Sequence, residues 1–236
     1  MPNLFLASLP QADRERLQPY LQPIALAPRM YVHSTGQPIQ HCYFPASGTA
    51  LSDLVSLSDG SEVEAGLIGR EGVVGLAALL AGDRPAPMTC MVQLPGRAVR
   101  VQASVLRREM MRSPDVLDRV LRFSLGLAIQ VAQTAACKAR HPLPQRLARW
   151  LLMMHDRAEG RTIPVTHETL SAMLGVRRPG VSIAARSLRE NGAISYARGA
   201  VAIVDRARLE ELSCECYAVV RDRRRQLDWP GSRLES

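Results

Sequence analysis

The feature that most constrains the fold is a change of hydrophobic period, followed by two closely spaced prolines. Over residues 24–105, short apolar runs alternate with Gly, Pro, Asp and Ser. Turn signals recur about every ten residues there, as in an antiparallel β barrel or sandwich. From Pro114 to Arg140 the period becomes helical, and Pro142 and Pro144 stop the helix. We therefore expect a β domain and a second domain joined by one long helix.

The long helix is predicted to bury two faces. Its apolar residues repeat with alternating spacings of four and three, which is the seam of a coiled coil. The seam consists of Leu117, Leu121, Ser124, Ala128, Val131 and Ala135, and a second stripe consists of Val120, Leu127 and Thr134. One face would pack on the β domain and the seam on a second copy, so we predict a homodimer. The alternative is a helix buried inside one monomer.

The charge indicates a polyanionic partner, either nucleic acid or an acidic membrane surface. The 236 residues carry a formal net charge of +8. Residues 141–204 hold 9 basic and 4 acidic side chains (net +5), whereas residues 1–140 hold 14 and 11 (net +3). This concentration favours DNA over a membrane. Aromatic residues, at 4%, are too few for a platform that stacks single-stranded bases.

Several classes of protein are not expected. No uninterrupted apolar run approaches the roughly 18 residues of a transmembrane helix, and the start, MPNLFLASLPQADRER, lacks the basic segment of a signal peptide. The 5 cysteines are odd in number and sparse, which favours a reduced, cytoplasmic setting. The chain lacks a phosphate-binding Gly-x-x-x-x-Gly-Lys, a Gly-x-Ser-x-Gly and a His-Glu-x-x-His. We therefore expect no enzyme.

Residues 167–188, HETLSAMLGVRRPGVSIAARSL, carry the functional signal. Two short helices with apolar inner faces would flank Gly175, where a tight turn needs a left-handed backbone. The inner faces are Leu170, Met173 and Leu174 in the first helix and Val181, Ala184 and Leu188 in the second. This is the pattern of a helix-turn-helix, although any pair of antiparallel helices shares part of it.

The outward face of the second helix indicates DNA recognition. It carries Arg177, Arg178, Ser182, Arg186 and Arg189, with Glu190 as its only acid. Arginines at the start of a recognition helix can bind guanine O6 and N7, while Ser182 and the helix N-terminus can hold phosphates. A following hairpin with Arg198 at its tip would form a wing that touches the DNA backbone. The alternative is a solvated basic face with no partner.

The order of these parts resembles the Crp/Fnr family of bacterial transcription regulators. The resemblance rests on a leading helix, the strings YFPASG and IGREGVVG, the long helix and THETLSAMLGVRRPGVS. It implies an α+β chain with an N-terminal double-stranded β-helix (jelly-roll) resembling a cyclic-nucleotide-binding domain, a central dimerisation helix and a C-terminal winged helix-turn-helix. The expected bounds are 1–112 for the sensor, 113–140 for the helix and hinge, 141–225 for the DNA-binding domain and 226–236 for a flexible tail.

The resemblance also implies residue roles. Arg178 matches the family arginine that reads a guanine, and Thr166 and His167 match positions that contact phosphates. Pro179 and Ile183 stand where the family commonly has a base-reading glutamate and arginine, so we expect a different operator. The predicted DNA-binding residues are Thr166, His167, Arg177, Arg178, Ser182, Arg186 and Arg198.

The sensor half departs from the family's cyclic-nucleotide binders. Gly72, Val73 and Gly75 match their phosphate cassette, and Arg84 could substitute for its arginine. However, Val73 replaces the glutamate that holds ribose, and the Arg-Ser pair that neutralises the phosphate is missing. The resemblance therefore implies a degraded cyclic AMP site, leaving an unidentified small-molecule effector or a vestigial sensor.

A metal or redox centre is also not expected. Oxygen sensors of the family bind an iron–sulfur cluster through N-terminal cysteines, and no cysteine precedes Cys42. Cys137, His141, Cys214 and Cys216 offer four soft ligands. We expect Cys214 and Cys216 in a single final helix capped by Asp205, where their sulfurs would point to different faces.

Taken together, the sequence predicts a homodimeric, sequence-specific transcription regulator acting on a two-fold symmetric operator. Expected partners are double-stranded DNA, a second copy, RNA polymerase and a small-molecule effector, with no membrane. The alternative is a cyclic-nucleotide, small-molecule or redox sensor whose DNA binding depends strictly on its ligand.

Overall fold

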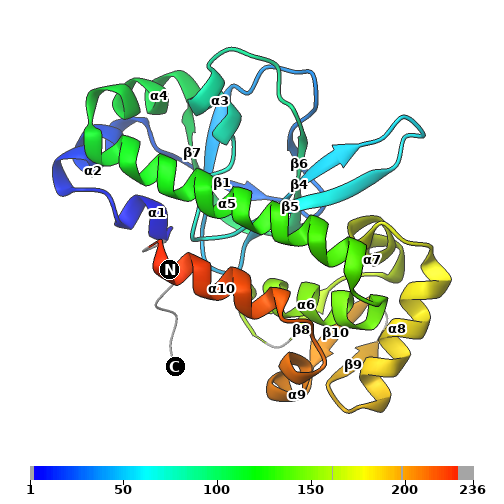
Figure 1. Cartoon of the computed structure of the whole chain (residues 1–236). Helices are drawn as coiled ribbons and strands as arrows, with labels where there is room; N and C mark the ends of the chain where they lie inside the picture. The colour runs from blue at the N-terminus through cyan, green and yellow to red at the C-terminus, as the bar shows by residue number, and fades with distance from the viewer. Residues whose placement is uncertain (1–2, 161, 198, 228–236) are drawn as a thin grey trace.

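The computed structural model describes residues 3–160, 162–197 and 199–227. The chain is α+β: a β-rich domain, one long helix and a helical domain with a small sheet follow one another (Figure 1). The strands are β1 (Gln22–Leu26), β2 (Tyr31–His33), β3 (His41–Pro45), β4 (Ala50–Ser56), β5 (Glu62–Ile68), β6 (Thr89–Leu94), β7 (Gly96–Gln102), β8 (Thr162–Pro164), β9 (Ile194–Ala197) and β10 (Ala200–Ile203). The helices are α1 (Leu4–Ala7), α2 (Gln11–Leu17), α3 (Leu76–Ala81), α4 (Ala103–Arg112), α5 (Pro114–Arg140), α6 (Leu143–His155), α7 (His167–Leu174), α8 (Arg178–Glu190), α9 (Arg206–Glu211) and α10 (Cys216–Gln226).

The β-rich domain is a roll of two antiparallel sheets with strand orders β1-β7-β3 and β2-β6-β4-β5. Its core includes three phenylalanines that come from distant parts of the chain. The ring of Phe5 in α1 lies 6.0 Å from that of Phe44 in β3 and 6.0 Å, edge-on, from that of Phe123 in α5. The long helix therefore contributes directly to the core of the roll.

Helix α5 begins and ends as its sequence dictates. Ser113 caps it by accepting a hydrogen bond from the Val116 N–H, and Pro114 occupies the first turn. The backbone turns extended at His141, just before Pro142. Helix α5 is long and apolar enough to cross a membrane. The core helices of soluble proteins often meet the same criterion of length and composition.

The two faces of α5 are in different environments. Val120, Phe123 and Leu127 are buried against the roll. On another face, Leu121 and Leu125 are 52% and 51% exposed. Two leucines half exposed on one helix form an apolar face that no described residue of this single chain covers.

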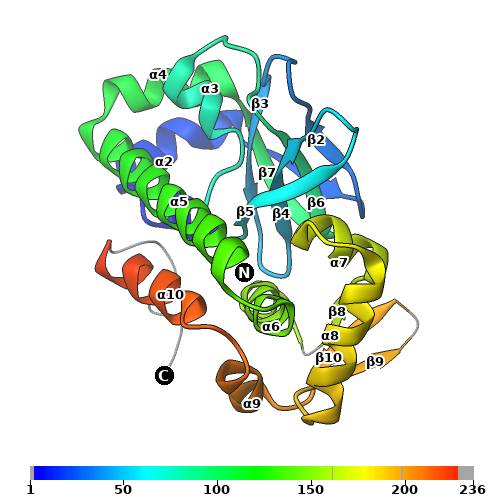
Figure 2. The same ribbon diagram turned by 45° about the vertical axis from the view of Figure 1, so that its right-hand side comes forward.

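The C-terminal domain is built on α6, α7, α8 and the small sheet β8-β10-β9 (Figure 2). Strands β9 and β10 pair as the expected hairpin, and β8 adds to the edge of β10. Helix α10 then returns to pack beside α5 and α6.

The expected single helix after Asp205 is wrong. Asp205 does cap α9, but α9 ends at Glu211, and a short irregular stretch separates it from α10. Cys214 lies in this stretch, and α10 begins only at Cys216. The break allows the chain to reverse onto α5, which a continuous helix would not do.

Candidate DNA-binding interface and sensor site

Helices α7 and α8 form the helix-turn-helix that the sequence predicts. Thr166 caps α7, since its Oγ1 accepts a hydrogen bond from the Thr169 N–H at 3.1 Å. Gly175 ends α7 with φ 63° and ψ 47°, the left-handed conformation in which glycine has no steric penalty. Pro179 lies in the first turn of α8, where a missing N–H costs little. The predicted inner-face residues are all buried: Leu170, Met173, Leu174, Val181, Ala184 and Leu188.

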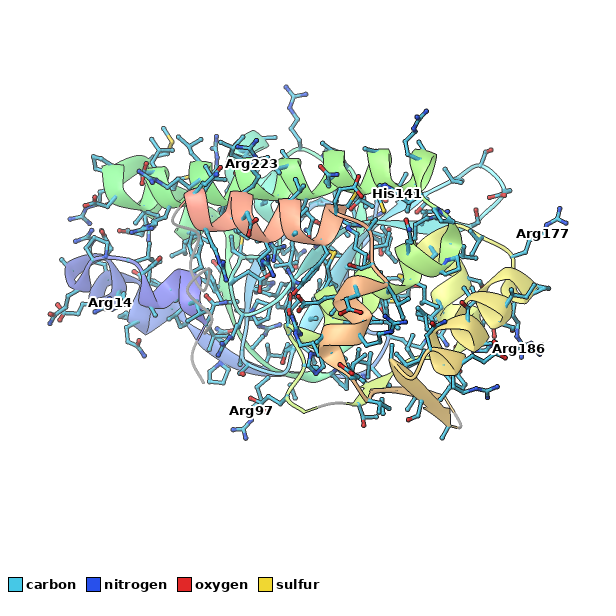
Figure 3. The ribbon with its side chains drawn as sticks, turned by 60° about the horizontal axis from the view of Figure 1, so that its bottom comes forward. Arg14, Arg97, His141, Arg177, Arg186 and Arg223 are labelled. Carbon is cyan, nitrogen blue, oxygen red and sulfur yellow. The ribbon has the colours of Figure 1, made fainter. Side chains whose placement is uncertain are left out.

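The outward face of α8 is basic and available to a ligand. Arg177, Arg178, Arg186 and Arg189 are all exposed. Within the described part of the chain, none of these four guanidinium groups has an ion pair or a side-chain hydrogen bond. Figure 3 shows Arg177 and Arg186 extending from the same end of the molecule. Such unpaired cations can bind phosphate or guanine without first breaking an internal contact.

Ser182 and His167 join the two helices. His167 Nδ1 lies 3.0 Å from Ser182 Oγ, and Ser182 Oγ donates to the Arg178 carbonyl at 3.3 Å. The His167 ring also packs on Tyr196 in β9, with ring centroids 4.4 Å apart. Burial, and secondarily the charge of Arg178, lower the pKa of His167, which favours the neutral ring. His167 therefore braces both helices against the hairpin, beyond the phosphate contact predicted for it.

The hairpin that would serve as a wing is present as β9 and β10. Arg198, predicted at its tip, lies outside the described residues. Thr166, at the base of α7, is exposed near this hairpin: a Cβ placed on Gly199 would lie 3.7 Å from Thr166 Cγ2. The start of α7 and the hairpin turn are thus neighbours.

The predicted effector residues lie in different environments. Val73 is fully buried. Gly72 lies directly against the long helix, because a Cβ there would come 2.2 Å from Phe123 Cε2. Gly75 caps α3 with φ 94°. Arg84, in contrast, is exposed in the segment after α3.

A cavity of about 520 Å³ lies elsewhere in the roll, beside α1 and the β1–β7 pair. Its lining is mostly apolar and includes Leu6, Ile24, Phe44 and Val99, with Arg97 at one side. None of the four predicted effector residues contributes to it. Any ligand in this cavity would therefore use a different part of the roll from the phosphate cassette.

Comparison with known families decides the identity. Residues 23–113 match the cyclic nucleotide-binding domain family, and residues 145–212 match the Crp-like helix-turn-helix domain family. The chain belongs to the Crp/Fnr family. It is therefore a DNA-binding transcription regulator with an effector-binding domain, and it is not an enzyme.

Solved structures show the same fold for this Crp/Fnr regulator. FixK2 from Bradyrhizobium japonicum is 18% identical, with a TM-score of 0.69 over 82% of this chain and 98% of that chain. A CRP-family regulator from Thermus thermophilus is 22% identical, with a TM-score of 0.66 over 80% and 96%. The c-di-GMP-responsive regulator CLP from Xanthomonas campestris is 16% identical, with a TM-score of 0.65 over 83% and 100%. A search of curated protein sequences finds no match.

Two features of this Crp/Fnr regulator were outside the predicted site residues. Ile183 is 68% exposed on the outward face of α8, although an isoleucine at a helical position is usually taken for core. The family resemblance had already placed Ile183 at a base-reading position, and its spacing from the buried Val181 and Ala184 is a second signal. The second feature is a group of four possible metal ligands whose ligand atoms all lie within 4.8 Å of one another: Cys137, His141, Cys214 and Cys216. They come together because Cys214 precedes α10 rather than lying within it.

Proposed function

We propose that this regulator binds a two-fold symmetric operator as a homodimer, with α8 in the major groove of each half-site. The observation that carries this proposal is the row of exposed, unpaired arginines on α8. Arg178, at the first turn, would read a guanine, while Arg177, Arg186 and Ser182 would contact the backbone and fix the register. Thr166, His167 and Arg198 would add phosphate contacts at the base of α7 and on the wing.

Ile183 adds an apolar element to this interface. Ile183 is 68% exposed in the middle of a basic helix face and belongs to neither hydrophobic core of the described residues. Placed in a major groove, its side chain would contact the methyl group of a thymine. We therefore expect a half-site that combines a guanine, read by Arg178, with a nearby thymine.

The exposed face of α5 supports the homodimer. Leu121 belongs to the predicted seam, and Leu125 extends it along the same face. Small residues of the seam, Ala128 and Ala135, are exposed further along the helix and would allow close approach of a second α5. Pairing of two such helices around a two-fold axis would also set the two copies of α8 apart by a fixed distance.

The sensor is proposed to act without cyclic AMP. Val73 fills the place of the ribose-holding glutamate, and Arg84 lies outside the core. A different small molecule, or none, would then set the balance between DNA-binding geometries. We also infer a cytoplasmic protein that contacts RNA polymerase when bound to DNA.

Selection of bound duplexes from a random pool, at a stated salt concentration, tests this function. An inverted repeat with half-sites about one helical turn apart is expected. Recovery of a consensus without two-fold symmetry would refute the dimer. Recovery of no consensus would refute the base readout. Titrating the selected operator with and without cyclic AMP then tests the sensor. A large cyclic AMP dependence would favour the ligand-dependent alternative.

A further inference from the structure

Four soft metal ligands converge where α5 ends and α10 begins. They are Cys137, His141, Cys214 and Cys216, and one ligand atom from each lies within 4.8 Å of all the others. Cys137 Sγ is 3.4 Å from Cys214 Sγ, and Cys216 Sγ is 3.5 Å from His141 Nδ1. Figure 3 shows His141 at this junction.

The three sulfurs are not part of either hydrophobic core. Cys137, Cys214 and Cys216 are 1%, 4% and 1% exposed and form a buried cluster of their own. They meet because two local patterns are brought together. Cys137 and His141 are four residues apart at the end of α5 and share a face. Cys214 and Cys216 flank the turn that starts α10.

We propose that these four residues bind one zinc ion in a closed, tetrahedral Cys₃His site. Tetrahedral coordination at a Zn–S distance of about 2.3 Å places sulfurs about 3.8 Å apart, so movements of about 1 Å or less would complete the site. Three thiolates and an imidazole suit zinc better than calcium or magnesium, which require oxygen ligands. Ligands this close together enclose one ion, whereas an iron–sulfur cluster would hold them farther apart.

The surroundings of the cluster are those of a metal ligand set. His141 points Nδ1 at Cys216, while its Nε2 lies 3.2 Å from Glu215 Oε1. A carboxylate on the far nitrogen orients a ligating histidine and makes the near nitrogen a better donor. Gln133 Nε2 also donates to Cys216 Sγ at 3.0 Å, as amides do to metal-bound thiolates.

The charge balance points the same way. Zinc with three thiolates carries one net negative charge, which must be compensated when it is buried. Arg149 is 5% exposed and lies against α5 beside the cluster, because its Nη2 donates to Thr134 Oγ1 at 3.0 Å, three residues before Cys137. Among the described residues, its hydrogen bond goes to the neutral Thr134 hydroxyl, and its Nε has no partner. Burial raises the pKa of the Glu64 carboxyl, and Arg149 is one of the groups that act to lower it, so Arg149 would supply part of the charge that compensates an anionic zinc centre.

Zinc would have a structural role here, since all four positions are filled by protein. Binding would release the thiol protons to solvent and fasten the start of α10 to the end of α5. The last helix would thereby be fixed to the helix that also packs on the sensor. This inference does not depend on DNA binding, so its test uses none.

The test uses the full-length chain, reduced and freed of metal with a chelator. Zn²⁺ is titrated in competition with a chromogenic chelator, and Co²⁺ is added separately as a spectroscopic probe. We expect one ion per chain, tetrahedral cobalt bands and thiolate-to-cobalt charge-transfer absorption of three thiolates. A rise in Tm on adding Zn²⁺ should accompany binding.

Variants locate the ion. Cys214→Ser should abolish the charge-transfer signal of one thiolate, and Glu215→Gln should weaken zinc binding by roughly 10- to 100-fold. Cys42→Ala, a buried cysteine far from the cluster, is the matched control and should bind as the parent chain does. If Cys214→Ser fails to fold, Glu215→Gln and the parent titration decide. Absence of zinc uptake by the reduced parent chain, an iron–sulfur spectrum, or a Cys137–Cys214 disulfide in place of metal would each overturn the proposal.

Discussion

Arg157 donates a hydrogen bond from Nε to Glu71 Oε1 at 2.9 Å, joining the segment after α6 to the roll across 86 positions of sequence. Both side chains are almost fully buried. Arg157 also donates from Nη1 to the Met153 carbonyl at 2.7 Å, which fixes its orientation. Burial alone would raise the pKa of Glu71, but Arg157 and Arg224 lower it below its ordinary value, so Glu71 is ionised. This pair holds the two domains in the observed arrangement.

Glu71→Gln should therefore destabilise the chain strongly. Removing one partner leaves the other charge buried and uncompensated, which costs about 3–5 kcal/mol. Because the folded-state pKa is depressed, this stabilisation is present above the unfolded pKa and is lost as pH falls through the folded one. Denaturant unfolding at neutral and acidic pH measures both effects. Glu211→Gln, which breaks the exposed pair with Arg208, should change stability by less than about 1 kcal/mol. Equal losses in the two variants would contradict the assigned role.

Arg178→Ala should weaken operator binding by about 1–3 kcal/mol and relax specificity at one position of each half-site. The reason is that an exposed guanidinium with no internal partner is free to read a guanine. Binding is measured against the selected operator and against single-base changes in it. Arg189→Ala, at the far end of the same helix, serves as the comparison and should reduce affinity uniformly. A uniform loss for Arg178→Ala would make that residue a phosphate contact.

Leu121→Glu should weaken self-association. In the proposed dimer the substitution places like charges at the seam, in a position where the leucine is 52% exposed in the single chain. Sedimentation at several protein concentrations measures the effect. Leu80→Glu replaces a leucine that is 49% exposed on α3, away from the seam, and should leave association unchanged. If only the Leu80 variant dissociated, the dimer would use a different face.

Much of the fold was predictable because it rests on local pattern. The spacing of Leu170, Met173 and Val181 around Gly175 defines the helix-turn-helix, and all three side chains are buried as expected. A helical period interrupted by prolines likewise defines α5.

Contacts between distant segments were not predictable in the same way. The meeting of Cys137 with Cys214 spans 77 positions. It depends on the irregular stretch before α10. The periodic spacing of apolar residues had predicted a continuous helix there. The Arg157–Glu71 pair was missed for the same reason. The sequence around Arg157 contains no pattern that indicates Glu71 as its partner, and the sequence around Glu71 contains none that indicates Arg157.

Gly72→Ala should destabilise the roll, because its new Cβ would lie 2.2 Å from Phe123 Cε2. Overpacking of this kind costs about 1–3 kcal/mol. Combining it with Phe123→Leu removes the clashing ring atoms, so the double variant should lose less than the sum of the two single losses. Denaturant unfolding of all four chains gives this coupling. Strict additivity would mean that Gly72 and Phe123 do not constrain each other.

Asp53→Asn should stabilise the chain at neutral pH. Asp53 on β4 lies beside His33 and Cys90, and burial raises the pKa of Asp53 to about 6. For an acid with a raised pKa, the folded state holds the proton longer, so stability falls as pH rises from the unfolded value of 3.8 through 6. A shift of this size corresponds to roughly 2–3 kcal/mol at pH 7, which asparagine would recover. Burial lowers the pKa of His33 to about 4. This shift has the opposite effect, because stability then rises with pH between about 4 and the unfolded value of 6.5.

With Asp53 replaced, the rise of stability with pH that His33 contributes should no longer be offset by Asp53. The stability of Asp53→Asn should thus rise from pH 4.5 to pH 6.5, whereas the parent chain should change much less over that range. Denaturant unfolding across these pH values measures the difference, with Asp83→Asn, an exposed aspartate of the same domain, as the control. Parallel pH profiles for the parent and Asp53→Asn would show that the pKa of Asp53 is the same in the folded and unfolded chain, which would contradict the raised value.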